Sequence, residues 1–475
     1  MSKIFPFSRL AGQALALILI FAACHAFDLT GMAKAAQGNE NTRPLRSGRQ
    51  LQSGKTAAVP AHALGMVEAV ERALGANPSL GSQEAQSRAS EEYRKSRRGT
   101  FGPRLSLSYS AQKQERDTSP QSVAPPRMGT WSGGLNIQQP VFQGLRLLAN
   151  YQAAALQADS DRAALRNAEL DMTSQVQTAF LACLAANETV RSESEALSRL
   201  KDQLRITRAF YEVGLRPRLD VLQAEVDVSQ AESSLVQAEN QRDTGYAQLN
   251  TLLGYPANAP ISYTGQLAHV PFKMTLEQCL QKAYEQRPDL FMAKKAVEIA
   301  QKEKLAVQSD YYPQIEAYYS INQQGNTPDL QRMGKNGSRT NTWEIGATAS
   351  WNVFQWGVTW YDDKRAGWQV TRMRHEEEDL RLNVGYEIKS RFLAVREAEK
   401  RIALAEKAIV QAREAYEAAL ARYQEQVGTN FDVLDASSNL TRAQANLTSA
   451  RADYLTALGQ LFAAMGEFHP DLLRP

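Results

Sequence analysis

The sequence predicts a mainly α-helical protein with a transmembrane β part, built from two copies of one unit. Three observations predict this fold class: an internal repeat, apolar residues at heptad spacing, and segments in which apolar and polar residues alternate. The repeat is the strongest of the three. Pro78 and Pro288 lie 210 residues apart, and Asp220-Val221-Leu222 and Asp432-Val433-Leu434 lie 212 apart. A spacing held this closely indicates a duplicated structural unit, with too few copies for a solenoid.

The composition excludes several classes of protein. The 54 Lys and Arg residues nearly balance the 51 Asp and Glu residues among 475, whereas a nucleic-acid binder usually carries a basic excess. The mean hydropathy of −0.43 excludes a protein that crosses a membrane with many helices. Cys24, Cys183 and Cys279 are too few for a disulfide framework or a four-ligand zinc site. We therefore expect no nucleic-acid partner, no cofactor and no metal.

The N-terminus has the layout of a secretory signal peptide over residues 1–35. Basic residues precede an apolar stretch at 10–23, and Ala33-Lys34-Ala35 places small residues at a cleavage site. The apolar stretch is short for a transmembrane helix. Phe21-Ala22-Ala23-Cys24 also resembles a lipoprotein box, so acylation of Cys24 is the second interpretation. Residues 36–65 are polar and are expected to form a disordered leader.

Each repeat shows the same order of elements: a helical stretch that ends before a proline, two strands, a very long helix and a last helix. The first repeat spans 66–256 and the second 274–466, with a linker at 257–273 and a tail at 467–475. The first repeat is expected to hold helices at 66–100, 145–212 and 220–253 and strands at 104–114 and 131–142. The second is expected to hold helices at 276–310, 357–426 and 432–465 and strands at 314–324 and 343–354.

The strands alternate most clearly in the second repeat. Trp343, Ile345 and Ala347 share one face of the last predicted strand, and the other face is polar. The polar residues expected to line a pore are Glu344, Thr348, Ser350 and Asn352. Strands of about ten residues with one apolar face are typical of a transmembrane β-barrel, although a half-buried sheet in a soluble protein has the same pattern. Tryptophans near both strand ends resemble interfacial belts and favour the membrane.

The long helices carry apolar residues at heptad spacing, which predicts coiled-coil packing. In the second repeat these are Ile402, Ala405, Ile409, Ala412, Tyr416, Ala419 and Tyr423; the first repeat has Val190, Glu193, Leu197, Leu200, Leu204, Thr207 and Tyr211. A helix of about 70 residues is about 100 Å long, and two shorter helices placed end to end match it. The chain thus supplies four helical columns and four strands. Four strands cannot close a barrel, so we expect oligomerisation to form a helical α-barrel continuing into a β-barrel.

These residues resemble the TolC family of outer-membrane efflux and type I secretion channels. The motifs are Tyr211-Glu-Val-Gly214-Leu-Arg-Pro-Arg-Leu-Asp220-Val-Leu and Tyr423-Gln-Glu-Gln-Val-Gly428-Thr-Asn-Phe-Asp432-Val-Leu-Asp435, followed by Ala443-Gln-Ala-Asn-Leu447. The resemblance covers about 66–466 in both repeats. One departure is that family members often carry an arginine just after the second-repeat glycine, where this chain has Thr429, Asn430 and Phe431.

The resemblance implies a homotrimer with twelve strands in the bacterial outer membrane and twelve helical columns in the periplasm. It implies a passive channel that exports drugs or secreted proteins, received from a periplasmic adaptor protein and an inner-membrane transporter, with outer-membrane lipid around it. The alternative is a periplasmic coiled-coil scaffold without a pore. An enzyme is not expected, because the repeats contain no nucleophile elbow or phosphate loop. The acidic run from His375 to Asp379 is interpreted as a solvated helix face.

The turns between the last two helices of each repeat are the predicted periplasmic mouth. Their glycines allow the positive φ or close approach that such a turn needs. The residues expected to dock the adaptor are Gly214, Leu215, Gly428 and Thr429, and the predicted gate consists of Tyr211, Asp220, Tyr423, Asp432 and Asp435. A three-fold axis would gather the carboxylates into a ring that favours cations, unless they only complement a helix dipole.

Overall fold

The computed structural model describes residues 63–114, 128–269, 271–325, 330, 339–469 and 471–473. The predicted signal peptide, Cys24 and the leader up to residue 62 lie outside these residues, as do most of the two loops that join the strands. The first unit comprises α2 (Met66–Ala76), α3 (Pro78–Gly99), β1 (Arg104–Gln114), β2 (Met128–Gln143), α4 (Arg146–Glu212) and α5 (Arg218–Leu252). The second comprises α6 (Leu276–Gln286), α7 (Pro288–Gln308), the 3₁₀ turn η1 (Ser309–Tyr311), β3 (Gln314–Gly325), β4 (Arg339–Ser350), α8 (Val358–Gln424) and α9 (Asn430–Ala464). The duplicated order predicted from the sequence is confirmed.

The first helical stretch of each unit differs from the prediction, because it is broken into two helices. Asn77 and Arg287 stand at the breaks with extended backbone, at φ −69° and −65°. Each precedes a proline, which disfavours the helical conformation of the residue before it. Pro78 and Pro288 then begin the next helix, where a missing N–H costs nothing. The sequence motif therefore marks a helix start as well as a helix end.

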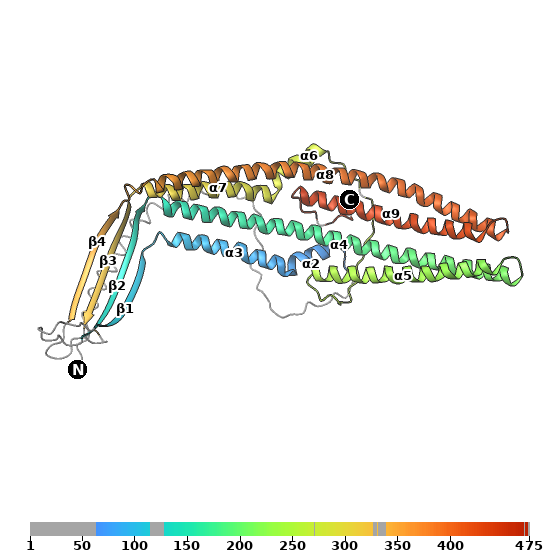
Figure 1. Ribbon diagram of the computed structural model, residues 1–475, viewed down its shortest axis with the longest axis horizontal. Helices are drawn as coiled ribbons and strands as arrows, with labels where there is room; N and C mark the ends of the chain where they lie inside the picture. The colour runs from blue at the N-terminus through green and yellow to red at the C-terminus, as the bar shows by residue number, and fades with distance from the viewer. Residues whose placement is uncertain are drawn as a thin grey trace. The chain divides into compact units, whose positions relative to one another are not determined.

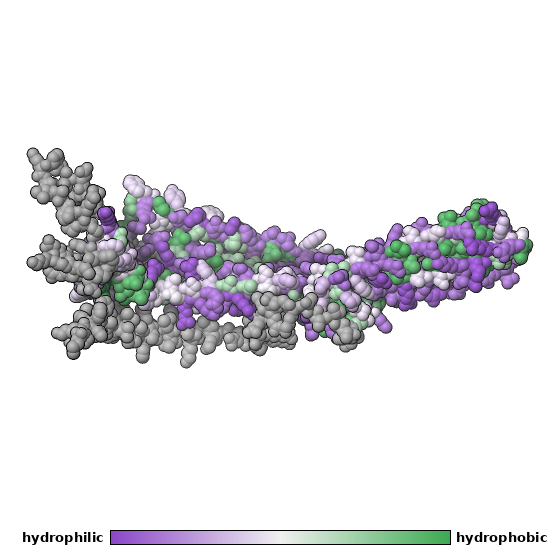
Figure 2. Space-filling model, turned by 90° about the horizontal axis from the view of Figure 1, so that it is seen from below, coloured by the Kyte–Doolittle hydropathy of each residue, from purple (hydrophilic) through white to green (hydrophobic). Residues whose placement is uncertain are grey.

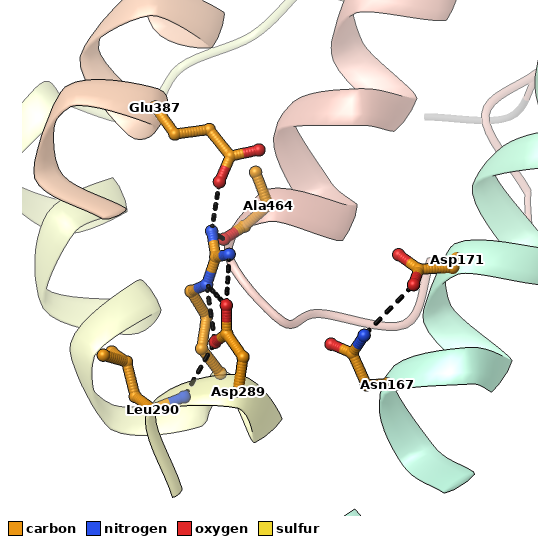
Figure 3. Close-up of polar contacts among 7 residues, drawn as sticks. Asn167, Asp171, Asp289, Leu290, Glu387 and Ala464 are labelled. Carbon is orange, nitrogen blue, oxygen red and sulfur yellow. Dashed lines mark hydrogen bonds and ion pairs between the residues drawn. The ribbon is translucent and has the colours of Figure 1, made fainter. Parts of the chain in front are cut away.

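Each break joins the shorter helices of a unit end to end. The Asn77 amide donates to the carbonyl of Leu252 at 2.9 Å, and the Arg287 guanidinium donates to that of Ala464 at 2.9 Å. Leu252 and Ala464 are the last residues of α5 and α9, so equivalent positions cap equivalent helix ends. Arg287 also pairs with Asp289 at 2.6 Å and Glu387 at 2.8 Å (Figure 3).

Four helical columns lie side by side (Figure 1). One column consists of α3 followed by α5, and it packs on α4. Next to α4 lies the column made of α7 and α9, and α8 packs on the other side of that column. The long helices α4 and α8 each contain 67 residues, which corresponds to about 100 Å. The column made of α3 and α5 and the helix α8 are therefore the two outer columns.

The main hydrophobic core lies where the columns are joined end to end. The linker between the two units crosses this region, and Tyr263 stacks edge to face on Phe180 with ring centroids 5.8 Å apart. A parallel bridge pairs Tyr263 with Leu64. Fully buried members of this core include Val70, Phe180, Leu181, Leu249, Ile388, Tyr454 and Leu461. Cys183 and Cys279 are buried here as free thiols, as expected for small apolar residues.

The heptad seam of the second unit is confirmed, because its positions on α8 are buried or half-buried while most of their neighbours are exposed. On α4 the predicted positions are mostly half-buried, and a second set of residues is buried more deeply. This set consists of Ser192, Ala196 and Gln203, together with Thr207 of the predicted seam. It faces α9, where Ser192 bonds Gln444 at 3.2 Å and Gln203 bonds Asn430 at 2.8 Å. The contact between the two units is thus partly polar, which a search for apolar heptads does not detect.

The four strands form one antiparallel sheet in the order β1-β2-β3-β4. β4 ends at Ser350, four residues before its predicted end, so Asn352 lies outside the strand. The reason is the partner strand: Gln314 pairs with Ser350 and is preceded by Pro313, which has no N–H to continue the ladder. Among the described residues, no helix is both long enough and apolar enough to cross a membrane.

Candidate functional site

The sheet has one apolar and one polar face across all four strands. Residues paired directly across antiparallel strands point to the same side. Leu107 pairs with Leu135, Leu135 with Ile321, and Ile321 with Trp343, so one apolar row crosses the whole sheet. The polar row beside it contains Ser106, Asn136, Ser320 and Glu344. The alternation found separately in each strand therefore converges on a single face.

Three of the four predicted pore-lining residues lie on the polar face of β4. Glu344, Thr348 and Ser350 pair with Ser320, Glu316 and Gln314. The hydroxyl of Tyr318, on the same face, donates to the Glu344 carboxylate at 2.6 Å. Asn352 lies two residues beyond the strand and is not part of this face.

The apolar face is uncovered in the described chain. Leu107 is 84% exposed and Trp343 is 67% exposed. More aromatic residues follow where β4 leads into α8: Trp351, Phe354, Trp356 and Trp360 are all exposed. Exposed apolar area of this extent marks a surface that contacts lipid or another protein. Tryptophans at its border are typical of a membrane interface.

The two turns at the far end of the helices differ in what they require of glycine. Gly214 has φ +78° and an added Cβ would meet nothing within 4 Å, so its role is conformational. In the second turn the positive φ, +62°, falls on Gln426. Gly428 is instead buried against Arg422, where an added Cβ would lie 3.2 Å from the Arg422 Cβ. The first turn thus uses the positive φ of its glycine, and the second turn uses the close approach that its glycine permits.

Tyr423 joins the two units just inside these turns. Its side chain is fully buried, its hydroxyl lies 3.1 Å from the Thr207 hydroxyl, and its ring packs on Phe210 with centroids 5.6 Å apart. The Arg216 guanidinium lies over the same ring at 5.0 Å and donates to the Gly428 carbonyl at 2.6 Å. One arginine from the first turn therefore contacts both the end of α8 and the second turn.

The predicted gate carboxylates are not gathered around Tyr423 within the chain. Asp432 accepts hydrogen bonds from the Thr429 backbone at 3.0 Å and hydroxyl at 2.7 Å, which lower the pKa of its carboxyl. It therefore caps α9, as the dipole interpretation expects. Asp435 accepts from Asn439 one turn further on, at 3.0 Å. Asp220 contributes its backbone carbonyl, which accepts from Asn430 at 3.4 Å.

Other predicted tip residues are exposed. Tyr211 and Leu215 point outward in the first turn, and Thr429 is exposed in the second. With Val213, Val427 and Phe431 they make hydrophobic surface at this end of the helices (Figure 2). Gln203 and Asn430 were missed as members of the buried contact, whereas Thr207 was a predicted seam position. Their only sequence signal is that polar residues stand at buried heptad spacing beside the tip motif.

No group of three or more His, Cys, Asp and Glu side chains within the described ranges is arranged to hold a metal. The run from His375 to Asp379 lies on α8, and His375, Glu376, Glu378 and Asp379 are exposed. The candidate functional features among the described residues are therefore the two-faced sheet and the pair of linked turns.

Comparison with known proteins identifies the class to which this arrangement belongs. The family model described as outer membrane efflux protein matches residues 69–255 and 279–467, one match for each repeat. The chain therefore belongs to the outer membrane efflux protein family, and the resemblance to TolC is confirmed. It is an efflux channel of the bacterial outer membrane, and its family consists of transport channels rather than enzymes. This favours the channel over the scaffold alternative.

Three relatives show the breadth of the family. The outer membrane efflux protein BepC of Brucella suis is 24% identical over 346 residues, covering 70% of each chain. The alkaline protease secretion protein AprF of Pseudomonas aeruginosa is 22% identical over 335 residues, covering 67% of each. In fold, the chain is similar to the crystal structure of the outer membrane protein VceC of Vibrio cholerae, with a TM-score of 0.72 and 20% identity. That match covers 85% of this chain and 96% of VceC.

Proposed function

We propose that three copies of the chain assemble into a passive export channel whose sheet spans the outer membrane and whose helices extend through the periplasm. One observation carries this proposal: the sheet has a predominantly polar face, an exposed and predominantly apolar face, and two edges unpaired within the described chain. The polar face, with Glu344, Thr348 and Ser350, lines the water-filled lumen. The apolar face, with Leu107 and Trp343, contacts lipid.

The open edges require further copies. Within the described chain, β1 pairs only with β2 and β4 pairs only with β3. Unpaired backbone N–H and C=O groups cost several kcal/mol each in a bilayer, so an open sheet of four strands is not stable there. Joining β4 of one copy to β1 of the next removes both edges. TolC-family channels typically form homotrimers, and three copies supply twelve strands.

The helical tips are the periplasmic mouth in this proposal. Arg216, Thr207 and Tyr423 hold the two turns of one chain together and keep the mouth narrow. The exposed apolar residues of the turns, among them Leu215 and Val427, form the docking surface for a periplasmic adaptor protein that connects the channel to an inner-membrane transporter. The cargo is a drug-like compound or a secreted protein, because the family includes channels for drug efflux and for protein secretion.

Mass measurement in mild detergent tests the assembly. The expected result is a particle of three chains that needs detergent to stay in solution and conducts ions when added to a planar bilayer. A monomer that is stable without detergent, or a trimer that does not conduct, contradicts the proposal.

A further inference from the structure

The two outer columns of the chain each carry a stripe of exposed residues over which no other helix of the described chain packs. These columns also continue into the edge strands, because α3 leads into β1 and β4 leads into α8. Near the sheet, the stripe on α8 follows steps of four and three residues, which is the spacing of a coiled-coil seam. Its members are Tyr361, Arg365, Trp368, Arg372 and His375.

Bulky side chains dominate this part of the stripe. Trp368 is 72% exposed, although it lies on a regular helix face rather than in a loop. It lies in a shallow surface groove. The groove is lined by Tyr361, Lys364, Arg365, Trp368, Gln369 and Arg372. A tryptophan left this exposed in a groove at heptad spacing indicates a surface that is covered on assembly.

The stripe on α3 has the opposite character. Its residues lie on the side of α3 that faces away from α4, whereas Ser90 bonds Asp161 of α4. They follow steps of three and four, and four of the five are serine or alanine. The members are Ser82, Ala85, Ala89, Glu92 and Ser96, all exposed.

Near the tip the sizes are reversed. The same face of α8 continues through Leu404, Ala408, Gln411, Ala415 and Ala418, all exposed and mostly small. On α5 the outward stripe begins with Leu219, Leu222 and Val226, which are large and exposed. The half near the sheet and the half near the tip therefore each offer one bulky and one small stripe. The bulky stripe lies on α8 near the sheet and on α5 near the tip.

We propose that α8 of one copy packs against α3 and α5 of the next copy, with aromatic side chains on serine and alanine near the sheet and leucines on alanines near the tip. A rotation that builds a ring brings opposite edges of successive copies together, so the contact is head to tail. Large residues against small ones let neighbouring helices interdigitate without voids. Arg365 and Glu92 also give the two sheet-proximal stripes opposite charges, although each forms an ion pair within its own helix, with Asp362 at 3.3 Å and Lys95 at 2.8 Å.

This inference rests on the proposed assembly of copies side by side, and it adds which residues form the contact. The reversal also fixes how two copies align along the helices. A copy displaced by half its length in one direction would place the Trp368 stripe against the bulky Leu222 stripe. Displacement in the other direction would place the alanines of α8 against the small residues of α3. A seam in which all side chains had the same size would not distinguish the aligned arrangement from the two displaced ones.

Size-exchange variants test the seam. Ala89→Trp should reduce the trimer fraction in detergent by about tenfold or more, because overpacking is destabilising, while a circular dichroism spectrum shows the monomer still folded. Gln83→Trp is the matched control, since Gln83 is exposed on the same helix but off the stripe. In the tip-proximal half, Ala415→Leu should have the same effect, and adding Leu222→Ala should restore most of the trimer. Equal effects of Ala89→Trp and Gln83→Trp would overturn the seam.

Disulfide trapping tests the proposed seam independently of the proposed assembly. Ala89→Cys combined in turn with Arg365→Cys, Trp368→Cys and Arg372→Cys should give covalently linked copies on oxidation for at least one pair. Gln83→Cys should give none with any of them. A conducting trimer in which no pair links would refute the seam and leave the proposed function standing, with lipid as the occupant of the Trp368 groove. Absence of any trimer would refute both.

Discussion

At the scale of single residues, Arg216 has a central role at the tip. Its guanidinium supplies a charge-assisted hydrogen bond to Gly428 and a cation–π contact to Tyr423, both across the boundary between the two units. The second turn has the uncharged residues Thr429 and Asn430 directly after Gly428. The cation that links the turns is thus provided from the first turn.

Replacing Arg216 with alanine should loosen the closed tip. A hydrogen bond from a charged donor contributes about 1.5–3 kcal/mol, so its loss should shift the balance between closed and open states by about tenfold or more. Single-channel recording should show a higher open fraction for Arg216→Ala. Arg218→Ala is the control, because Arg218 is exposed in the adjoining helix start. If the two variants conduct alike, Arg216 does not hold the tip closed.

Asp171 gives a prediction on pH. Burial raises the pKa of its carboxyl, and the negative charges of Asp289 and Glu387 raise it further against the opposing effect of Arg287. A carboxyl whose pKa is raised by folding favours the folded state only while protonated, so its ionisation lowers stability above that pKa. Figure 3 shows Asp171 accepting a hydrogen bond from Asn167, which an asparagine could also accept.

Asp171→Asn should therefore stabilise the protein at neutral pH. The group is partly exposed, so we expect a rise in Tm of only about 1–2 °C at pH 7. The rise should shrink at acidic pH, where the native carboxyl becomes protonated. Thermal unfolding in detergent at both pH values measures this, with the exposed Asp202→Asn as control. A lower Tm for Asp171→Asn at pH 7 would show that the charge is favourable.

The sequence predicted the tip glycines but not the distinct use of each. Gly214 and Gly428 occupy equivalent places in the two motifs, yet only Gly214 has positive φ, and Gln426 takes that conformation in the second turn. The difference depends on how closely Gly428 approaches Arg422, which is set by the backbone path of the turn and is not encoded by the residue type of the glycine. Tyr423 was predicted as a gate residue, but its partner Thr207 is revealed only by the packing of α4 on the second unit.

At the scale of elements, the sequence predictions agree best with the structure where a sequence pattern has a single physical cause. Strict alternation places residues on two faces of a strand, and all four strands obey it in the structure. Strand ends are less predictable, because they depend on the partner. β4 stops at Ser350 since Pro313, just before Gln314, has no N–H to pair, although the alternation continues through Trp351 and Val353.

The two faces of β4 should respond differently to charge. Ile345 lies near the middle of the strand on the apolar face, so Ile345→Arg should cost about 2–4 kcal/mol in the bilayer and block assembly. Thr348→Arg introduces the same side chain on the polar face and should be tolerated. Outer-membrane fractionation and heat-modifiable migration on gels report assembly. Equal loss, or equal tolerance, in the two variants would contradict the assignment of faces.

At the scale of the whole molecule, the sheet and the linked turns occupy opposite ends of the helical columns (Figure 1). With long helices of about 100 Å, the turns are far from any membrane that the sheet spans. The polar face of the sheet and the narrow contact at the turns then lie at the two ends of one path. In the proposed channel, transport is controlled at the end where the two units of each chain meet.

This arrangement predicts the orientation in the cell. Ser338 lies in the segment joining β3 to β4, outside the described residues, and Val427 is a 73% exposed tip residue. A membrane-impermeant thiol reagent should label Ser338→Cys in intact cells, because that segment follows the strand ends furthest from the helices. It should label Val427→Cys only after the outer membrane is permeabilised. Cys183 and Cys279 are buried, so native thiols add little background. Labelling of Val427→Cys in intact cells, with Ser338→Cys protected, would place the helices outside the cell and invert the direction of the channel.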